Sequence, residues 1–134
     1  MSEYLSTLGL CVGYDGKALI RDVALCVQRG KIVTLIGPNG SGKSTILKTI
    51  ISQLPAIDGS VILDGKDMRT RSRSDIARRM AIVMTARMDP ELMTCRDVVS
   101  SGRYPYTGGL GILRAEDKKI VEECLAQVDA LDFA

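Results

Sequence analysis

The feature that most constrains this chain is a stretch of nine residues, rich in glycine, that ends in lysine, serine and threonine. It matches the phosphate-binding pattern G-x-x-x-x-G-K-[ST] and consists of Gly37, Pro38, Asn39, Gly40, Ser41, Gly42, Lys43, Ser44 and Thr45. The glycines let backbone N–H groups turn inward and form an anion-binding nest. Lys43 is placed to reach the β- and γ-phosphates of a nucleotide, and the Ser44 hydroxyl suits Mg²⁺.

The neighbouring residues supply the context that this pattern requires. Lys31–Ile36 is a short apolar, β-branched run, which predicts a buried parallel strand. After the loop, apolar residues recur at helical spacing, which predicts a helix that Pro55 ends; they are Leu47, Ile50, Ile51 and Leu54. A strand–loop–helix order directs the positive end of the helix dipole at the phosphates. The sequence therefore predicts binding of a nucleoside triphosphate, in preference to a plain glycine-rich turn.

Composition narrows the class of protein. The chain has 134 residues, with 18 basic against 16 acidic side chains, and this balance argues neither for nor against a nucleic-acid partner. No apolar run approaches transmembrane length and the N-terminus lacks a secretory signal, so we expect a soluble, cytoplasmic protein. The four cysteines are widely spaced and histidine is absent. We therefore expect reduced thiols and no zinc site.

The rest of the chain alternates short strands with turns and helices. Strands are predicted at Tyr4–Val12, Val23–Val27, Val61–Leu63 and Ala81–Met84, with a turn at Gly13–Gly16 and a hairpin at Asp64–Gly65. Helices are predicted near Asp75, over Thr94–Ser101 and over Ile120–Leu131, the last with Glu116 and Asp117 near its start. The arginine-rich stretch Met68–Met80 has no interleaved aromatic residues, so we interpret it as a solvated loop and predict no nucleic-acid partner.

Taken together, these residues resemble the first half of the ATP-binding subunit of an ABC transporter. The resemblance rests on Gly13–Asp15, Val23–Val27, Gly30–Ile32, Leu35–Thr45 and Val61–Asp67. Two further segments, Leu92–Val99 and Gly102–Pro105, are most similar to the importers of ferric siderophores, haem and cobalamin. The resemblance implies an α/β P-loop NTPase fold, in which an antiparallel β opening precedes an incomplete parallel sheet with helices. Residues 1–134 would be the N-terminal part of the nucleotide-binding domain, truncated before the signature motif and the metal-binding Asp of the second strand.

The resemblance also implies roles for individual residues. The ring of Tyr14 stacks on adenine, whereas the residues alone favour a turn tyrosine packed on the sheet. Residues 37–45 bind ATP and Mg²⁺, with Lys43 catalytic and Ser44 as the metal ligand. Thr85 stands where the family usually has a glutamine that contacts Mg²⁺ and the attacking water. A threonine hydroxyl is shorter and reaches Mg²⁺ only through a water, so the catalytic and metal role of Thr85 needs its own test.

The function that the resemblance implies is that of an ATP-binding subunit of an importer for iron–siderophores or related metal chelates. Its partners are a second ATPase subunit, in a homodimer, and the membrane permease, which holds it at the inner face of the membrane. Hydrolysis belongs to the full-length dimer, and the 134-residue chain alone is expected to be inactive. The alternatives are a soluble non-transport ABC ATPase, another P-loop NTPase such as a GTPase or a nucleoside kinase, and a fragment without a nucleotide function. A guanine-reading Asn-Lys-x-Asp segment is absent.

One expectation concerns folding. In the sheet order that the resemblance implies, two strands from the missing half lie between Ile32–Ile36 and Ile82–Met84. Without them, both segments lose parallel partners and expose apolar edges. We therefore expect a swapped or edge-paired oligomer, a rearranged sheet, or a piece of a longer protein.

Overall fold

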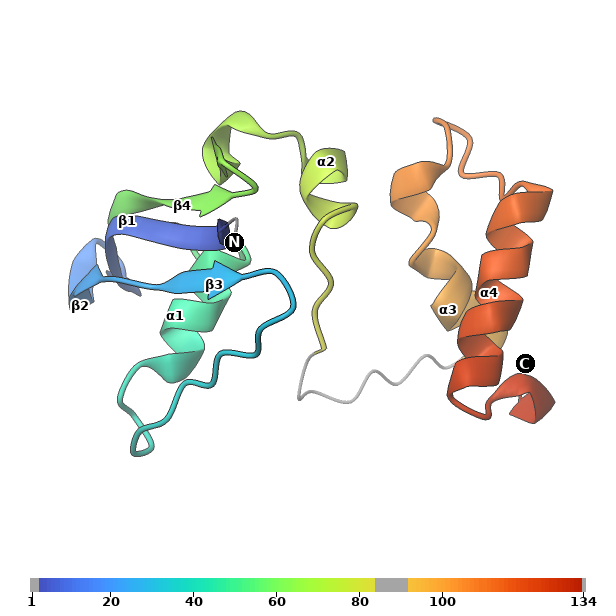
Figure 1. Cartoon of the computed structure of the whole chain (residues 1–134), viewed down its shortest axis with the longest axis horizontal. Helices are drawn as coiled ribbons and strands as arrows, with labels where there is room; N and C mark the ends of the chain where they lie inside the picture. The colour runs from blue at the N-terminus through green and yellow to red at the C-terminus, as the bar shows by residue number, and fades with distance from the viewer. Residues whose placement is uncertain (1–2, 84–91, 134) are drawn as a thin grey trace. The chain divides into compact units, whose positions relative to one another are not determined.

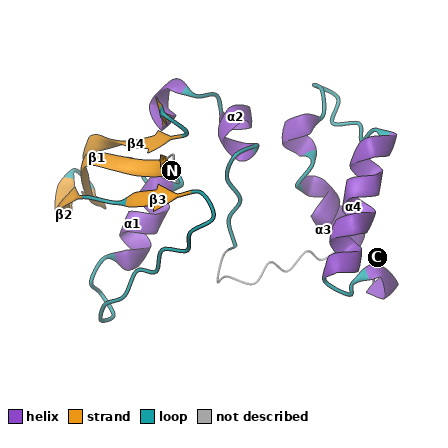
Figure 2. Ribbon diagram, in the orientation of Figure 1, coloured by secondary structure: helices purple, strands orange, loops and turns teal. Residues whose placement is uncertain are grey.

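A computed structural model of the chain describes residues 3–83 and 92–133, which fall into two compact units, Met1–Ser72 and Arg73–Ala134. Figures 1 and 2 show the elements of each unit. The first holds β1 (Glu3–Tyr14), β2 (Lys17–Val23), β3 (Cys26–Gln28), α1 (Lys43–Ile50), β4 (Asp58–Leu63), β5 (Lys66–Asp67) and the 3₁₀ turn η1 (Met68–Thr70). The second holds α2 (Arg73–Ala77), α3 (Cys95–Ser101), the 3₁₀ turn η2 (Tyr104–Tyr106), α4 (Ala115–Gln127) and the 3₁₀ turn η3 (Leu131–Phe133).

The sheet of the first unit is built around β1. This strand pairs with β3 near its start, with β2 near its end and with β4 along its other edge, and β4 turns back into β5. Each of these described pairs is antiparallel, which confirms the predicted antiparallel opening. The turn between β4 and β5 lies at Asp64 and Gly65, both with positive φ, as predicted for a hairpin.

A bulge in the middle of β1 changes which residues face the core. Before it, Leu5 and Thr7 are buried; after it, Leu10 and Val12 are buried, so the alternation shifts by one residue. The shift falls at Gly9, whose φ is +54° and where the pairing with β4 loses register. On β4, Gly59 approaches the Gly9 backbone so closely that a Cβ there would lie 2.3 Å from the Gly9 carbonyl oxygen. Glycine at both positions allows this bulge.

The prediction of one continuous strand at Val23–Val27 is wrong, because the Thr7 side chain interrupts the strand between Val23 and Cys26. The Thr7 hydroxyl donates to the Val23 carbonyl at 2.6 Å and accepts from the Leu25 amide at 2.9 Å. The side chain thus takes up backbone groups that a continuous ladder would use, so β2 ends at Val23 and β3 begins at Cys26. These bonds also satisfy a threonine hydroxyl that lies inside the core.

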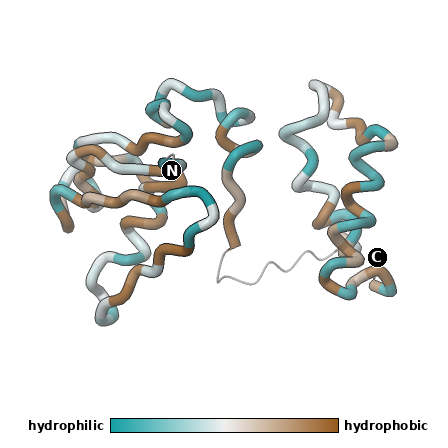
Figure 3. The backbone as a smooth tube through the Cα atoms, viewed as in Figure 1, coloured by the Kyte–Doolittle hydropathy of each residue, from teal (hydrophilic) through white to brown (hydrophobic). Residues whose placement is uncertain are grey.

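The predicted parallel strands are also wrong for the described residues. Lys31–Ile36 lies outside any strand, with Ile32 96% and Ile36 91% exposed, and Figure 3 shows hydrophobic colour along this solvated segment. Of the strand predicted at Ala81–Met84, the first three residues are likewise outside any strand, and Val83 is 98% exposed. Met84 lies outside the described residues. A strand persists only where a neighbour takes up its N–H and C=O groups. Among the described residues, neither segment is part of the sheet, which consists of β1 to β5.

Helix α1 is shorter than the predicted helix. It ends at Ile50, because Ser52 adopts a left-handed conformation with φ of +60°. The amides of Gln53 and Leu54 then turn back to the carbonyl of Lys48, at 2.9 and 3.1 Å. This closure satisfies the end of the helix several residues before Pro55. The helix contacts β1 in the first unit.

The second unit is organised by capped helices. Thr94 and Asp97 form a reciprocal capping box at the start of α3, and Asp117 accepts from the Arg114 amide at the start of α4. Val121 and Leu125 are the buried residues on the apolar face of α4. The helices predicted near Asp75 and over Thr94–Ser101 are confirmed. The helix predicted over Ile120–Leu131 is also present, but α4 begins earlier, at Ala115, and ends earlier, at Gln127. Within the described ranges, no helix has the length and apolar character needed to cross a bilayer.

Candidate nucleotide-binding site

The predicted phosphate loop is an exposed turn that leads directly into α1. Asn39 and Gly40 form its tip, and the Ser41 amide donates to the Pro38 carbonyl at 3.2 Å. Gly40 and Gly42 are left-handed, with φ of +83° and +89°. Gly42 is the residue just before the helix, and no side chain caps this end of α1. The first amides of the helix therefore open toward the loop, where an anion can accept hydrogen bonds from them.

Lys43 is the first residue of α1, and its ammonium group folds back over the loop. Nζ donates to the carbonyl oxygens of Gly37 and Pro38, each at 2.7 Å, and lies 3.4 Å from the Oγ of Ser41. The positive charge thus stands within the turn itself. Phosphate oxygens form stronger hydrogen bonds with an ammonium group than neutral carbonyls do, so a nucleotide can compete for this lysine.

Ser44 and Thr45 follow on the first turn of α1 and point to different environments. Ser44 is exposed, so its hydroxyl is open to a hard cation that arrives with the phosphates. Thr45 is only 4% exposed, and its carbonyl accepts the hydroxyl of buried Thr49 at 2.9 Å. The residues present therefore fit a magnesium–phosphate group on one side of the turn and a packed core on the other.

The structure brings Tyr14 to this loop from the last position of β1. Its hydroxyl lies 3.2 Å from Oγ1 of Thr45, and either oxygen can donate. The side chain remains 48% exposed, which leaves ring area for contact with a base. Tyr14 thus lies beside the loop that carries Lys43 and Ser44, although its stacking role stays a prediction. Thr85 lies outside the described residues, and its role also stays a prediction.

Sequence reasoning missed the part of β2 that contacts the loop. A Cβ added to Gly42 would lie 2.5 Å from Cδ1 of Ile20 and 3.4 Å from Cδ2 of Leu19. Both residues lie on β2, of which only the last residue, Val23, was predicted as strand. The signal was present in Asp15–Gly16, a dipeptide typical of hairpin turns, between two apolar runs. The β1–β2 hairpin therefore contributes a wall to the site.

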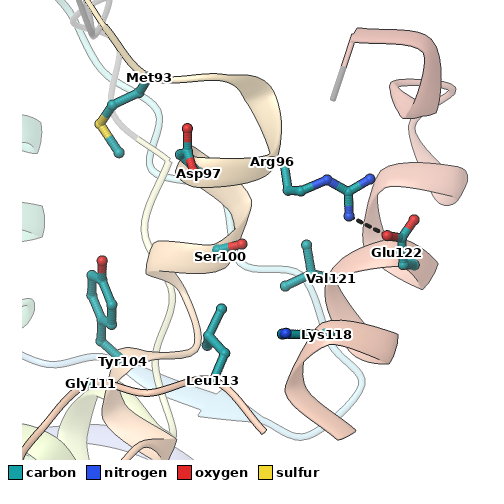
Figure 4. Close-up of a pocket in the computed structure, with 10 residues that line it drawn as sticks. All are labelled: Met93, Arg96, Asp97, Ser100, Tyr104, Gly111, Leu113, Lys118, Val121 and Glu122. Carbon is teal, nitrogen blue, oxygen red and sulfur yellow. Dashed lines mark hydrogen bonds and ion pairs between the residues drawn. The ribbon is translucent and has the colours of Figure 1, made fainter. Parts of the chain in front are cut away.

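A second concave region lies in the other unit (Figure 4). This groove of about 600 Å³ is lined by residues of α3, η2 and α4. An ion pair joins Arg96 to Glu122 across it, and Lys118 and Asp97 complete its charged lining. Two cations and two carboxylates leave the groove without a net charge to attract a triphosphate. The phosphate loop of the first unit therefore remains the candidate site for a nucleotide.

A further electrostatic feature of the second unit is the pair of hydrogen-bond donors around Asp117. The Arg114 amide and the Arg103 guanidinium both donate to this carboxylate, the latter at 2.9 Å, and they hold the pKa of Asp117 below its ordinary value. The Arg103 guanidinium also lies over the Tyr106 ring, 3.9 Å from its centroid. Arg103 of the Gly102–Pro105 segment thus joins η2 to the start of α4, which gives this segment a structural role.

A sequence model of the ABC transporter family matches residues 20–134. The chain belongs to the ABC transporter family. This membership agrees with the resemblance found in the sequence. The match begins after Tyr14, so it covers the whole phosphate loop but not the tyrosine.

Relatives of this ABC transporter chain are ATP-binding proteins. An uncharacterised ABC transporter ATP-binding protein of Methanocaldococcus jannaschii is 44% identical over 94% of this chain and 43% of its own length. The iron(3+)-hydroxamate import ATP-binding protein of Bacillus subtilis is 40% identical over 97% of this chain and 48% of its own length. A solved ATP-binding subunit of an ABC transporter superposes with a TM-score of 0.77 at 26% identity, over 95% of this chain and 51% of that one. The chain spans about half the length of these ABC relatives.

Proposed function

We propose that residues 1–134 are the N-terminal part of an ATP-binding subunit of an ABC importer and bind Mg-ATP at the phosphate loop. The carrying observation is the grouping of Lys43, Ser44 and Tyr14 around the first turn of α1. Within a single unit, this turn offers a charge for the phosphates, an exposed hydroxyl for a metal and an aromatic ring for a base. A nucleoside triphosphate needs all three of these features.

Different residues of the site bind the phosphates, the metal and the base. The amides at the start of α1 and the Lys43 ammonium hold the phosphates, and the Ser44 hydroxyl holds Mg²⁺. Tyr14 presents its ring to the base. The bound Mg-ATP supplies a phosphoanhydride bond, the cleavage of which drives transport in the complete assembly. We infer that hydrolysis needs the second ATPase subunit of a homodimer, so that this chain alone binds ATP without turnover.

The substrate class that we propose is an iron–siderophore or a related metal chelate. Support comes from relatives whose names specify iron(3+)-hydroxamate and achromobactin transport, 40% and 37% identical to this chain. The resemblance of the Gly102–Pro105 segment to importers of this group supports the same class. The proposed location is the inner face of the membrane, with attachment through the permease subunits.

The first test is ATP binding by the purified chain. Wild type, Lys43→Ala and the control Lys48→Ala are titrated with ATP, ADP and adenosine in the presence of Mg²⁺. Lys48 lies on the exposed side of the same helix and is one turn beyond the loop, so the control removes the same charge outside the site. Lys43→Ala is expected to weaken ATP binding by about 1.5–3 kcal/mol, the range of a charge-assisted hydrogen bond, with little change for adenosine.

Two results would contradict the proposal. One is the absence of saturable ATP binding by the wild-type chain. The other is an equal loss of affinity for all three ligands in Lys43→Ala, because adenosine carries no phosphate for the lysine to bind. The substrate class is tested separately with the full-length gene. Cells that lack this gene are expected not to grow on ferric hydroxamate as the sole iron source. A copy of the gene with Lys43→Ala should fail to restore growth.

A further inference from the structure

One hydrogen bond joins the two halves of the proposed nucleotide site. The Tyr14 hydroxyl at the end of β1 lies 3.2 Å from Oγ1 of Thr45, which is the third residue of α1. Tyr14 belongs to the proposed base platform, and Thr45 follows directly on the lysine and serine of the proposed phosphate and metal contacts. The bond spans 31 positions in the sequence, so only the fold brings its two partners together.

Stacking on a base does not require this hydroxyl. A phenylalanine ring offers the same face, and a tyrosine that is 48% exposed can satisfy its hydroxyl with water. Here the hydroxyl instead meets a threonine that is only 4% exposed. The buried Thr45 hydroxyl needs a partner, and Tyr14 provides it. The bond therefore restrains the first turn of α1 more than it orients the Tyr14 ring.

The same hairpin touches the start of α1 at a second point. Ile20 of β2 lies against Gly42, where an added Cβ would be 2.5 Å from Cδ1 of Ile20. On its inner side, Thr45 is tied to Thr49 through its carbonyl at 2.9 Å. Contacts at Gly42 and Thr45 thus bracket Lys43 and Ser44, the two residues proposed to hold the phosphates and the metal.

We propose that the Tyr14 hydroxyl is a positioning group for the phosphate loop, separate from the role of the Tyr14 ring at the base. The inference rests on the proposed function. Through Thr45, the hydroxyl restrains the first turn of α1, so that its amides and the Lys43 and Ser44 side chains are already oriented when phosphate arrives. Loss of the hydroxyl alone should therefore weaken binding of the phosphates, whereas loss of the ring should weaken binding of the base.

The test measures dissociation constants for ATP, ADP and adenosine with Tyr14→Phe, Thr45→Val and the double variant. Each single variant is expected to weaken ATP and ADP by about three- to tenfold, the range of one neutral hydrogen bond, and adenosine by less than about twofold. The double variant is expected to lose no more than either single one, because both remove the same bond. Tyr14→Ala also removes the ring and should weaken adenosine as well.

Two controls separate positioning from stability. Thr45→Ser keeps the hydroxyl and is expected to restore most of the preference for ATP over adenosine that Thr45→Val loses. Thr49→Val removes the bond on the inner side of Thr45, so it should lower the melting temperature without changing that preference. Tyr14→Phe alters an exposed side chain and folds even if Thr45→Val does not.

The outcomes distinguish this inference from the proposed function. If wild type binds no ATP, the proposed function fails and the inference fails with it. If wild type binds ATP and Tyr14→Phe binds ATP equally well, the inference alone is refuted. Equal losses for ATP and adenosine in Tyr14→Phe would also refute it, since the hydroxyl would then serve the base.

Discussion

Alanine substitutions at two glycines of the phosphate loop can separate the energetic cost of backbone strain from that of a side-chain clash. Gly40 and Gly42 share a left-handed conformation, with φ of +83° and +89°. A Cβ at Gly40 would meet nothing within 4 Å, whereas a Cβ at Gly42 would lie 2.5 Å from Cδ1 of Ile20. The loss of stability in Gly40→Ala therefore measures the cost of the left-handed backbone alone. The loss in Gly42→Ala measures that cost together with the cost of the clash with Ile20.

The expected losses follow from these two terms. A left-handed conformation costs a non-glycine residue about 1–2 kcal/mol, and the lower entropy of the unfolded alanine chain offsets about 0.4–1 kcal/mol of it. Gly40→Ala should thus lower the free energy of unfolding by about 1 kcal/mol. Gly42→Ala must also turn the end of the Ile20 side chain away, which adds about 0.5–1.5 kcal/mol. Urea denaturation of the chain measures both values.

A third variant tests the contact directly. Ile20→Val removes Cδ1, so Gly42→Ala in that background should fall to nearly the value of Gly40→Ala, with Ile20→Val alone as the reference. ATP titration should follow the same order, because the amide after Gly42 begins the helix that faces the phosphates. Equal losses for Gly40→Ala and Gly42→Ala, unchanged by Ile20→Val, would refute the contact between β2 and the phosphate loop.

Three further predictions concern other parts of the chain. In the full-length subunit, Thr85→Gln should leave ATP affinity nearly unchanged while altering single-turnover hydrolysis and its stimulation by the permease; identical rates for both variants would remove this position from the chemistry. Because hydrogen bonds lower the pKa of Asp117 in the folded state, its contribution to stability is complete above the ordinary value of 3.8 and is lost as the pH falls through the lower folded value. The difference in melting temperature between wild type and Asp117→Asn should therefore shrink in acid, and a constant difference would contradict the assignment. The exposed Ile32 and Ile36 should pair with another chain, so light scattering and intact mass on one sample are expected to show an oligomer, and a monodisperse monomer would count against edge pairing.

The local signals in the sequence determined most of the site. The G-x-x-x-x-G-K-[ST] pattern located the loop, because the glycines that shape the turn and the lysine that provides its charge are neighbours in the sequence. The helix after the loop, the hairpin at Asp64–Gly65 and most of the capped helix α4 were also predicted. Each depends on residues within a few positions of one another, such as a turn dipeptide or a capping box.

The tertiary structure decided what depends on partners that are distant in the chain. The apolar, β-branched residues from Lys31 to Ile36 predicted a strand, yet a strand needs a neighbour for its hydrogen bonds and this segment lies outside the sheet. Thr7 divides β2 from β3 through bonds to Val23 and Leu25, which the pattern of apolar residues does not encode. The bond from Tyr14 to Thr45 joins residues 31 positions apart. No local propensity specifies such a pair, because its geometry exists only once β1 and α1 have packed together.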